Sequence, residues 1–346
     1  MVETTDPPCN AAVVERTAWL MGTTLTARVC AATRADGVEA VDRAFTRVRR
    51  LEARLSTWRS DSELSRLNNA PPGQWVPVSS VTAALLEEVR EWTTATDRAF
   101  DPAVGAAIDA WGLRGTGRRP APTELAAARA ATGPDAWKIA AGTGRGGDDA
   151  RVRRAAGVRL DAGAFGKGAA LRSAAATLRS ASLSWALLDF GGQLTLWSRE
   201  SADRWSIGVA DPERRDRTVL RLRIGSASIA TTGVSERGAR VDGARVGHVV
   251  DPRTAAPVRA WGSVTVVADD PLAADVLSTA YFVLGPDAAL ARAAEEGESA
   301  PGVLVLESAA AGLAMRRNER LDELASVGSI TGEIELRDRG VFSNET

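Results

Sequence analysis

The sequence predicts an α+β fold in which mixed sheets pack against helices, and three observations lead to this prediction. Apolar residues recur at helical spacing in the first part of the chain, the character of the sequence changes from about Arg151, and short β-like runs then appear with helical patterns between them. Strands and helices follow one another without strict alternation, which argues against a doubly wound parallel sheet. With 346 residues, the chain is long enough for one large domain or two ordinary ones.

Two amphipathic helices are predicted early in the chain, over about residues 38–55 and 80–96. Serines stand at the start of the second helix, where they can accept hydrogen bonds from unpaired backbone N–H groups. A polar segment at 68–73 separates the two helices. The glycine-, arginine- and proline-rich segment 115–122 is expected to be a surface loop, and 123–131 a short alanine-rich helix.

The second half of the chain mixes short strands with helices. Strands are predicted at 186–190, 205–209, 219–224, 263–268, 302–306 and near 329–336. Helices are predicted over 165–182, 272–284 and 287–295. We therefore expect a main domain over 18–317, with a candidate sub-domain boundary near 113–122, an N-terminal extension over 1–17 and a C-terminal extension over 318–346.

Composition excludes several classes of protein. Hydrophobic residues make up 45% of the chain and charged residues 25%, as in ordinary globular proteins, and a net charge of -1 gives no protein-wide attraction for nucleic acid. Cys9 and Cys30 are too few for a disulfide scaffold and show no metal-site spacing. His248 is the one histidine, so a multi-histidine metal site is excluded. Nearly all basic residues are arginine, so individual arginines carry little weight.

The sequence also predicts where the chain works. No segment approaches the roughly 18–20 continuous apolar residues that span a bilayer. The N-terminal segment lacks a basic stretch followed by an apolar core. We therefore expect no membrane insertion and a cytoplasmic location.

A glycine-rich turn at 160–168 is the first of four clusters that could carry chemistry. It lies between a strand-like end and a helix, so its backbone N–H groups could hold a phosphate with Lys167 as counter-charge. Its spacing matches neither the P-loop nor the dinucleotide pattern. A tight turn that needs small residues explains it about equally well.

The second and third clusters offer a base and a pair of oxygen ligands. An imidazole has an ordinary pKa of about 6.5, which suits His248 to general-base catalysis, although a lone histidine in an apolar stretch is more often structural. On a helix, Asp275 and Thr279 would point the same way and present hard oxygen ligands that suit Mg²⁺. The alternative is that Thr279 bonds back to a helix carbonyl while Asp275 lies near the helix start.

The fourth cluster is aromatic. Trp58 and Phe100 follow the two predicted helices and could stack on a flat ring system. Aromatic residues at helix ends more often belong to a core.

Taken in order, these clusters resemble the ApbE family of FAD:protein FMN transferases. The resemblance covers about Met21 to Gly285 and depends on eight short motifs in the right order. They are MGT at 21–23, LSTWRSDSELSRLN at 55–68, TDRAFDPAVG at 96–105, LDAG through KG at 160–168, FGG at 190–192, IATTG at 229–233, HVVDPRT at 248–254, and AD with T at 274–279.

The resemblance implies an α+β, T-fold-like enzyme that depends on Mg²⁺ and uses FAD as its substrate. Such an enzyme transfers FMN to a threonine or serine hydroxyl of an acceptor protein and releases AMP. The residues at positions that contact FAD in the family are Met21, Trp58, Ala99, Phe100, Asp101, Asp161, Lys167 and Val249. The residues at metal positions are Ala164, through its carbonyl, Asp275 and Thr279, and His248 stands where the family has a histidine that activates the acceptor hydroxyl.

Three residues depart from the family pattern. Arg172 stands where the family usually has an aspartate, Gln193 where it has another, and Ala255 where the Asp-Pro-Arg-Thr turn ends in glycine. Arg172 reverses a charge near the expected phosphate loop, which leaves reaction rate and partner choice open. An FAD diphosphatase and a non-catalytic flavin-binding protein are the alternatives, and the retained His248 and Asp275 argue against the second.

Overall fold

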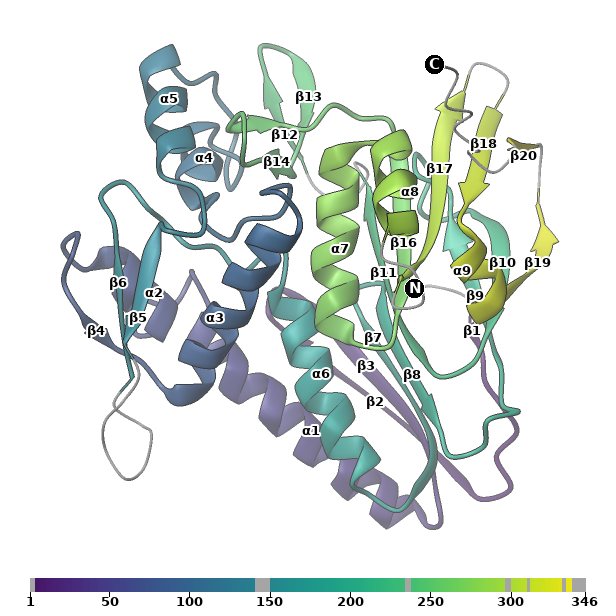
Figure 1. Ribbon diagram of the computed structural model, residues 1–346. Coiled ribbons are helices and arrows are strands. Elements are labelled where there is room, and N and C mark those ends of the chain that lie inside the picture. The colour runs from purple at the N-terminus through teal and green to yellow at the C-terminus, as the bar shows by residue number, and fades with distance from the viewer. Residues whose placement is uncertain are drawn as a thin grey trace. The chain divides into compact units, whose positions relative to one another are not determined.

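Two units divide the chain, and each is built from segments that are distant in the sequence (Figure 1). The computed structural model describes residues 4–140, 150–233, 238–295, 300–309, 312–331 and 334–337. Unit 1 consists of Met1–Phe45, Leu171–Glu236 and Ala260–Thr346. Unit 2 consists of Thr46–Ala170 and Arg237–Arg259.

Unit 1 contains a nine-stranded sheet, in which neighbouring strands are antiparallel except for the last pair. Its strands, in spatial order, are β2 (Ala12–Leu20), β3 (Thr23–Ala31), β7 (Leu183–Phe190), β8 (Gln193–Ser198), β11 (Ala227–Gly233), β16 (Gly262–Ala268), β17 (Gly302–Ala309), β18 (Gly312–Arg317) and β20 (Ile334–Leu336). A four-stranded sheet has the order β1 (Thr4–Thr5), β9 (Trp205–Ala210), β10 (Thr218–Ile224) and β19 (Ala325–Ile330).

The main core of unit 1 joins side chains of both sheets. Trp185 and Leu196 from the larger sheet cluster with Trp205 and Leu222 from the smaller one, and each is at most 1% exposed. Strand β16 is buried along six of its seven residues, because one face contributes to this core and the other lies under a helix. Because both faces are covered, the polar Ser263 and Thr265 of this strand are buried together with its valines.

Helix α7 (Pro271–Leu284) packs on β11 and β16 within unit 1 (Figure 1). Local sequence sets both ends of this helix. The Asp270 side chain caps its start by accepting the Ala273 N–H at 3.0 Å, proline occupies the first turn, and Gly285 follows the end with a φ of 87°. The remaining helices of this unit are α8 (Pro286–Glu295) and α9 (Glu319–Leu324).

Unit 2 combines helices with short strands. Its helices are α2 (Glu63–Asn69), α3 (Ser80–Ala95), α4 (Gly105–Ala110) and α5 (Pro122–Ala130). Its strands are β4 (Val76–Pro77), β6 (Arg151–Arg154) and β5 (Trp137–Ala140) in one sheet, and the pairs β12 (Gly238–Val241) with β13 (Ala244–Gly247) and β14 (Val250–Asp251) with β15 (Ala256–Pro257). Helices α1 (Arg34–Leu55) and α6 (Gly166–Arg179) each contribute residues to both units.

The structure confirms the predicted α+β class and most predicted elements, but local pattern reading missed several others. The β2–β3 hairpin was not predicted, and Asn68 lies inside α2 although its segment was expected to interrupt the helices. Cys9 and Cys30 form a disulfide bond across 21 residues, a pairing that two isolated cysteines do not reveal in sequence. None of the helices in the described ranges is long and apolar enough to cross a bilayer.

Candidate functional site

The predicted site residues divide between the two units. Unit 1 holds three of them: Met21, Asp275 and Thr279. Unit 2 holds Trp58, Ala99, Phe100, Asp101, Asp161, Ala164, Lys167, His248 and Val249.

Asp275 and Thr279 lie one helical turn apart on α7. Asp275 is 4% exposed, and the Thr279 hydroxyl donates to the Asp275 carbonyl oxygen at 3.2 Å. This bond is the structural alternative that the sequence left open. It is nevertheless compatible with cation binding, because a hydroxyl has one proton to donate and two lone pairs that remain available.

The chemistry of this donor pair fits Mg²⁺, which prefers carboxylate and hydroxyl oxygens and usually keeps waters or substrate phosphates in its shell. No cluster of three or more His, Cys, Asp or Glu side chains suited to a metal occurs within the described residues. A cation on α7 would therefore depend on phosphate, water or backbone oxygens for the rest of its ligands.

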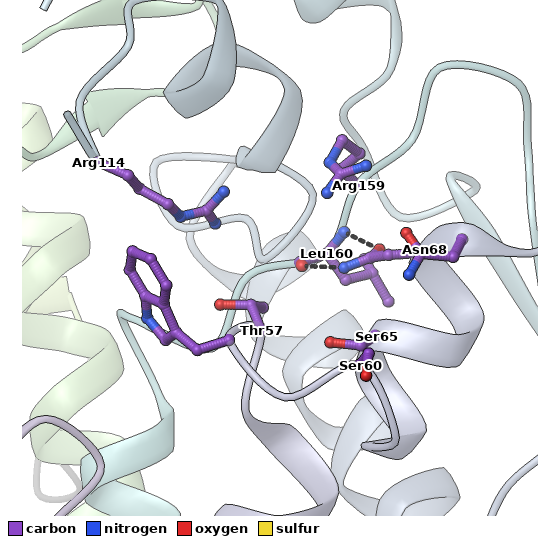
Figure 2. A pocket seen from close by; sticks show the side chains of 9 residues that line it. Thr57, Ser60, Ser65, Asn68, Arg114, Arg159 and Leu160 are labelled. Carbon is purple, nitrogen blue, oxygen red and sulfur yellow. Dashed lines mark hydrogen bonds between the residues drawn. The ribbon is translucent and has the colours of Figure 1, made fainter.

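Unit 2 contains a small cavity of about 180 Å³ (Figure 2). Its lining combines hydroxyls, amides, two guanidinium groups and one large aromatic ring. The residues are Thr57, Trp58, Ser60, Ser65, Asn68, Asn69, Arg114, Arg159 and Leu160. Trp58 is 78% exposed, so it is a surface ring, whereas Phe100 is 1% exposed and belongs to the core. The two aromatic candidates of the sequence analysis therefore differ in accessibility.

Asn68 is bonded to Leu160, and both residues line this cavity. Its side-chain amide donates to the Leu160 carbonyl and accepts from the Leu160 N–H, both at 2.8 Å, and Figure 2 shows these two bonds. Asn68 is 5% exposed, so both bonds are shielded from water. The amide thereby fixes the backbone immediately before Asp161.

Hydroxyl groups hold the loop that carries Trp58. Ser62 caps α2 by accepting the Ser65 N–H at 2.9 Å, and its own hydroxyl donates to the Ser56 carbonyl at 2.6 Å. The Ser65 hydroxyl donates to the same carbonyl at 3.0 Å. These bonds fix the loop backbone and leave the indole at the surface.

The two arginines that line the cavity are paired with carboxylates outside its lining. Arg114 pairs with Asp109 at 2.6 Å and also with Asp161, and Arg159 pairs with Asp109 at 2.8 Å. These four charges balance. Sequence analysis missed both arginines because arginine replaces lysine almost everywhere in this chain, which hides individual residues among a common type.

Asp101 organises a loop of unit 2. It is 3% exposed, and its carboxylate accepts the Ala103 N–H at 2.8 Å and the Gly133 N–H at 2.6 Å. Burial raises the pKa of Asp101, although these two bonds and the charge of Arg98 act in the opposite direction.

A backbone bond from the Asp161 N–H to the Pro102 carbonyl, at 2.7 Å, joins this loop to the glycine-rich turn. The structure thus joins the loop of Asp101 to the turn of Asp161, although the two residues are 60 positions apart in the sequence. Within the turn, Asp161 also accepts the Gly163 N–H at 2.7 Å. Ala164 and Lys167 follow it and are half-buried, and Lys167 lies in the first turn of α6.

His248 and Val249 precede the Asp-Pro-Arg-Thr turn. His248 is half-buried, and the Val249 carbonyl accepts the Val258 N–H at 2.8 Å. Ala255 ends the turn with a φ of 55°, in the left-handed region that favours glycine. Met21 is also left-handed, with a φ of 48°, and it lies in the turn between β2 and β3.

Comparison with known proteins shows what the fold and these motifs belong to. The ApbE family model matches residues 21–302, which is more than half of the chain. The chain belongs to the ApbE family. An FAD:protein FMN transferase of Treponema pallidum (strain Nichols) is 31% identical over 259 residues, which are 71% of this chain and 71% of that protein.

Solved ApbE structures share the fold. The ApbE protein of Thermotoga maritima matches with a TM-score of 0.78 and 27% identity, covering 90% of this chain and 99% of its own. The apo form of the Pseudomonas stutzeri flavinyl transferase ApbE matches with a TM-score of 0.77 and 25% identity, covering 92% and 98%. The predicted family, fold class and transferase class are thereby confirmed.

Proposed function

We propose that this ApbE-family chain transfers FMN from FAD to a threonine or serine hydroxyl of an acceptor protein and releases AMP, with Mg²⁺ as cofactor. The observation that carries the proposal is the pair of oxygen ligands on α7, Asp275 and Thr279, in a chain that is 31% identical to a named FAD:protein FMN transferase.

The proposed transfer needs no reactant other than FAD and the acceptor hydroxyl. The acceptor hydroxyl oxygen forms a bond to the phosphorus of the FMN half, and the bond from that phosphorus to the bridging oxygen breaks. The bridging oxygen leaves with AMP, and His248 accepts the hydroxyl proton. A hydroxyl is a weak nucleophile without such a base, and His248 is the one imidazole in the sequence.

Charge on the diphosphate opposes attack by an oxygen nucleophile. Asp275, Thr279 and the carbonyl of Ala164 would hold Mg²⁺, and Lys167 would add a second positive charge. When bound, the cation neutralises the phosphate charge that develops during transfer.

The unit 2 cavity is proposed to take one portion of FAD. Its volume of about 180 Å³ is below the roughly 300–1,000 Å³ of sites that enclose a whole ligand. The exposed Trp58 ring can stack on a flat ring, and Asp161 lies next to the cavity wall formed by Leu160. Met21, Ala99, Phe100, Asp101 and Val249 stay proposed FAD contacts. For Ala99 and Phe100, whose side chains are 1% exposed, the proposed contact is made through the backbone.

The proposal is tested by incubating the chain with FAD, Mg²⁺ and candidate acceptor proteins encoded beside its gene. We expect AMP to be released and the acceptor mass to rise by one FMN phosphoester, and EDTA to stop both. If AMP appears together with free FMN and an unmodified acceptor, the chain is instead an FAD diphosphatase. If no AMP appears with any acceptor or with water, the transferase hypothesis and the diphosphatase hypothesis are both wrong.

We also propose that the chain works in the cytoplasm, and one feature of the structure makes this location a sharp test. The Cys9–Cys30 disulfide is a bond that reducing cytoplasm normally disfavours. Cell fractionation together with thiol labelling decides the matter. Cytoplasmic chain with both thiols free would support the proposal, and oxidised chain outside the cytoplasm would refute it.

A further inference from the structure

Two side chains from different elements of unit 1 hold the start of α7. From α6, the Arg172 guanidinium donates to both carboxylate oxygens of Asp270, with Nε at 2.6 Å from Oδ1. From β8, the Gln193 amide donates to the Pro271 carbonyl at 3.1 Å. Both residues depart from the ApbE pattern, and both contact the same helix end.

The first contact combines two tasks in one carboxylate. Asp270 caps α7 by accepting the Ala273 N–H, and it also receives Arg172 in a forked arrangement. The Arg172 and Asp270 side chains are 38% and 35% exposed, so water screens the pair and its contribution to stability is small. Its forked geometry, in contrast, restricts how the helix start can rotate.

The second contact reaches the turn that carries Asp275. In an α-helix, the carbonyl of residue 271 is the acceptor for the N–H of residue 275. Gln193 is 3% exposed, and its Oε1 has no hydrogen-bond partner among the described residues. An unpaired buried acceptor is unfavourable for folding, so stability alone does not explain a glutamine at this position.

The middle of α7 is held as well. The Ser278 hydroxyl donates to the Asp275 carbonyl at 3.0 Å and lies 2.9 Å from the Thr232 hydroxyl of β11. Since the Ser278 proton is already donated, Thr232 is the donor in the second bond. α7 is therefore held at the side chains of Asp270 and Ser278 and at the Pro271 carbonyl, positions that flank Asp275 and precede Thr279.

We propose that Arg172 and Gln193 are positioning residues that fix the first turn of α7, so that the Asp275 carboxylate and the Thr279 hydroxyl face one cation together. This inference rests on the proposed function. Mg²⁺ accepts little departure from octahedral geometry, and a ligand pair on one helix keeps its aim only if the helix cannot rotate.

The test measures cation binding directly. Mn²⁺ is titrated into the FAD-loaded chain without acceptor, and free Mn²⁺ is followed by electron paramagnetic resonance, with a titration of FAD alone subtracted. We expect Arg172→Ala to weaken Mn²⁺ binding about 10-fold, a typical loss when a residue behind a metal ligand is removed. Asp270→Asn should have the same effect, because asparagine keeps the helix cap and loses the ion pair. The double variant should be no weaker than either single variant.

Gln193→Leu separates positioning from stability. Leucine removes the bond to Pro271 and also removes the unpaired oxygen, so the melting temperature should stay equal or rise while Mn²⁺ affinity falls several-fold. Arg317→Ala is the matched control, since Arg317 and Asp322 form a comparable pair in unit 1, both 30% exposed, between β18 and α9. It should leave Mn²⁺ affinity unchanged.

The outcomes distinguish this inference from the proposed function. If Asp275→Ala binds Mn²⁺ as tightly as the wild type, the cation assignment itself is wrong. If Asp275→Ala loses Mn²⁺ while Arg172→Ala and Gln193→Leu bind it normally, the cation site stands and the positioning inference is overturned.

Discussion

Helix α7 of unit 1 and the Trp58 loop of unit 2 hold their candidate site residues in different ways. Asp275 is 4% exposed, on a helix whose start and middle are bonded to three other elements. Trp58 is 78% exposed, and the bonds around it hold only the loop backbone. One region fixes the direction of its ligands, whereas the other leaves its aromatic ring free to adjust.

This difference matches the demands of the two proposed tasks. Cation coordination depends on ligand positions within fractions of an ångström, so it needs a fixed helix. Stacking on a flat ring tolerates sliding and tilting, so an exposed ring on a fixed loop is sufficient. Changes on α7 should therefore affect the rate of transfer, and changes at Trp58 should affect FAD affinity.

Between the two regions compared, the largest effect is expected at α7. Asp275→Asn keeps the shape of the side chain and removes its charge, so kcat for AMP release should fall about 10²–10³-fold, with a smaller change in FAD affinity. Asp287→Asn, which removes a carboxylate on α8 whose side chain is 75% exposed, is the control and should be neutral. Unchanged AMP release by Asp275→Asn would show that α7 does not hold a carboxylate needed for transfer, and the contrast between α7 and the Trp58 loop would then have no functional meaning.

The next effect is expected at Asn68, whose two bonds to Leu160 hold part of the lining of the unit 2 cavity. Asn68→Ala leaves the Leu160 N–H and carbonyl unpaired in a buried position, so the free energy of unfolding should fall by about 2–4 kcal/mol in urea denaturation. Asn69 lines the same cavity but is exposed, and Asn69→Ala should change stability by less than about 0.5 kcal/mol. Equal effects of the two variants would show that the Asn68–Leu160 bonds do not contribute to the free energy of unfolding.

A smaller effect is expected for the exposed ring. Trp58→Ala should weaken FAD binding about 10-fold, because stacking on an aromatic side chain contributes about 1–3 kcal/mol, while kcat at saturating FAD changes little. Trp75→Ala is the control in the same unit, since Trp75 packs against the Arg153 guanidinium and does not line the cavity. Calorimetric titration of FAD compares the two, and equal affinities would contradict the assignment of Trp58.

The smallest effect is expected at Ala255. Because its φ of 55° is costly for alanine, Ala255→Gly should stabilise the chain by about 1 kcal/mol in urea denaturation. Ala107 belongs to the same buried cluster but lies in α4, so Ala107→Gly should destabilise by about 1 kcal/mol. A loss of stability in both variants would show that the turn is not strained.

Sequence reasoning located the elements whose signals are local. The bounds of α7 were predicted to within one residue, because the Asp-Pro start and the Gly285 end are adjacent to the apolar run that they delimit. The motifs also identified Asp275, Thr279 and His248 as candidates. The long-range hydrogen bonds near these candidates and beside Asp161 were not predicted, because Arg172 and Asp270 are 98 residues apart, and Asn68 and Leu160 are 92 apart. No local pattern encodes such a pairing.

The sequence also did not predict which aromatic side chains are exposed to solvent. Trp58 and Phe100 looked alike as aromatics at helix ends, yet one is at the surface and the other in the core. The sequence showed that Arg172 reverses a charge near the expected phosphate loop, but it did not show that Asp270 pairs with it. For Arg172, the partner comes from a distant part of the chain.

The central claim is that FMN goes to a protein hydroxyl whose proton is accepted by His248. The most direct measurement follows AMP release and FMN attachment in one reaction, for the wild type and for His248→Ala, at saturating FAD. The account predicts one attached FMN for each AMP in the wild type. It also predicts a loss of about 10²–10⁴-fold in attachment for the variant, with FAD affinity unchanged. A His248→Ala chain that modifies its acceptor at the wild-type rate would contradict it.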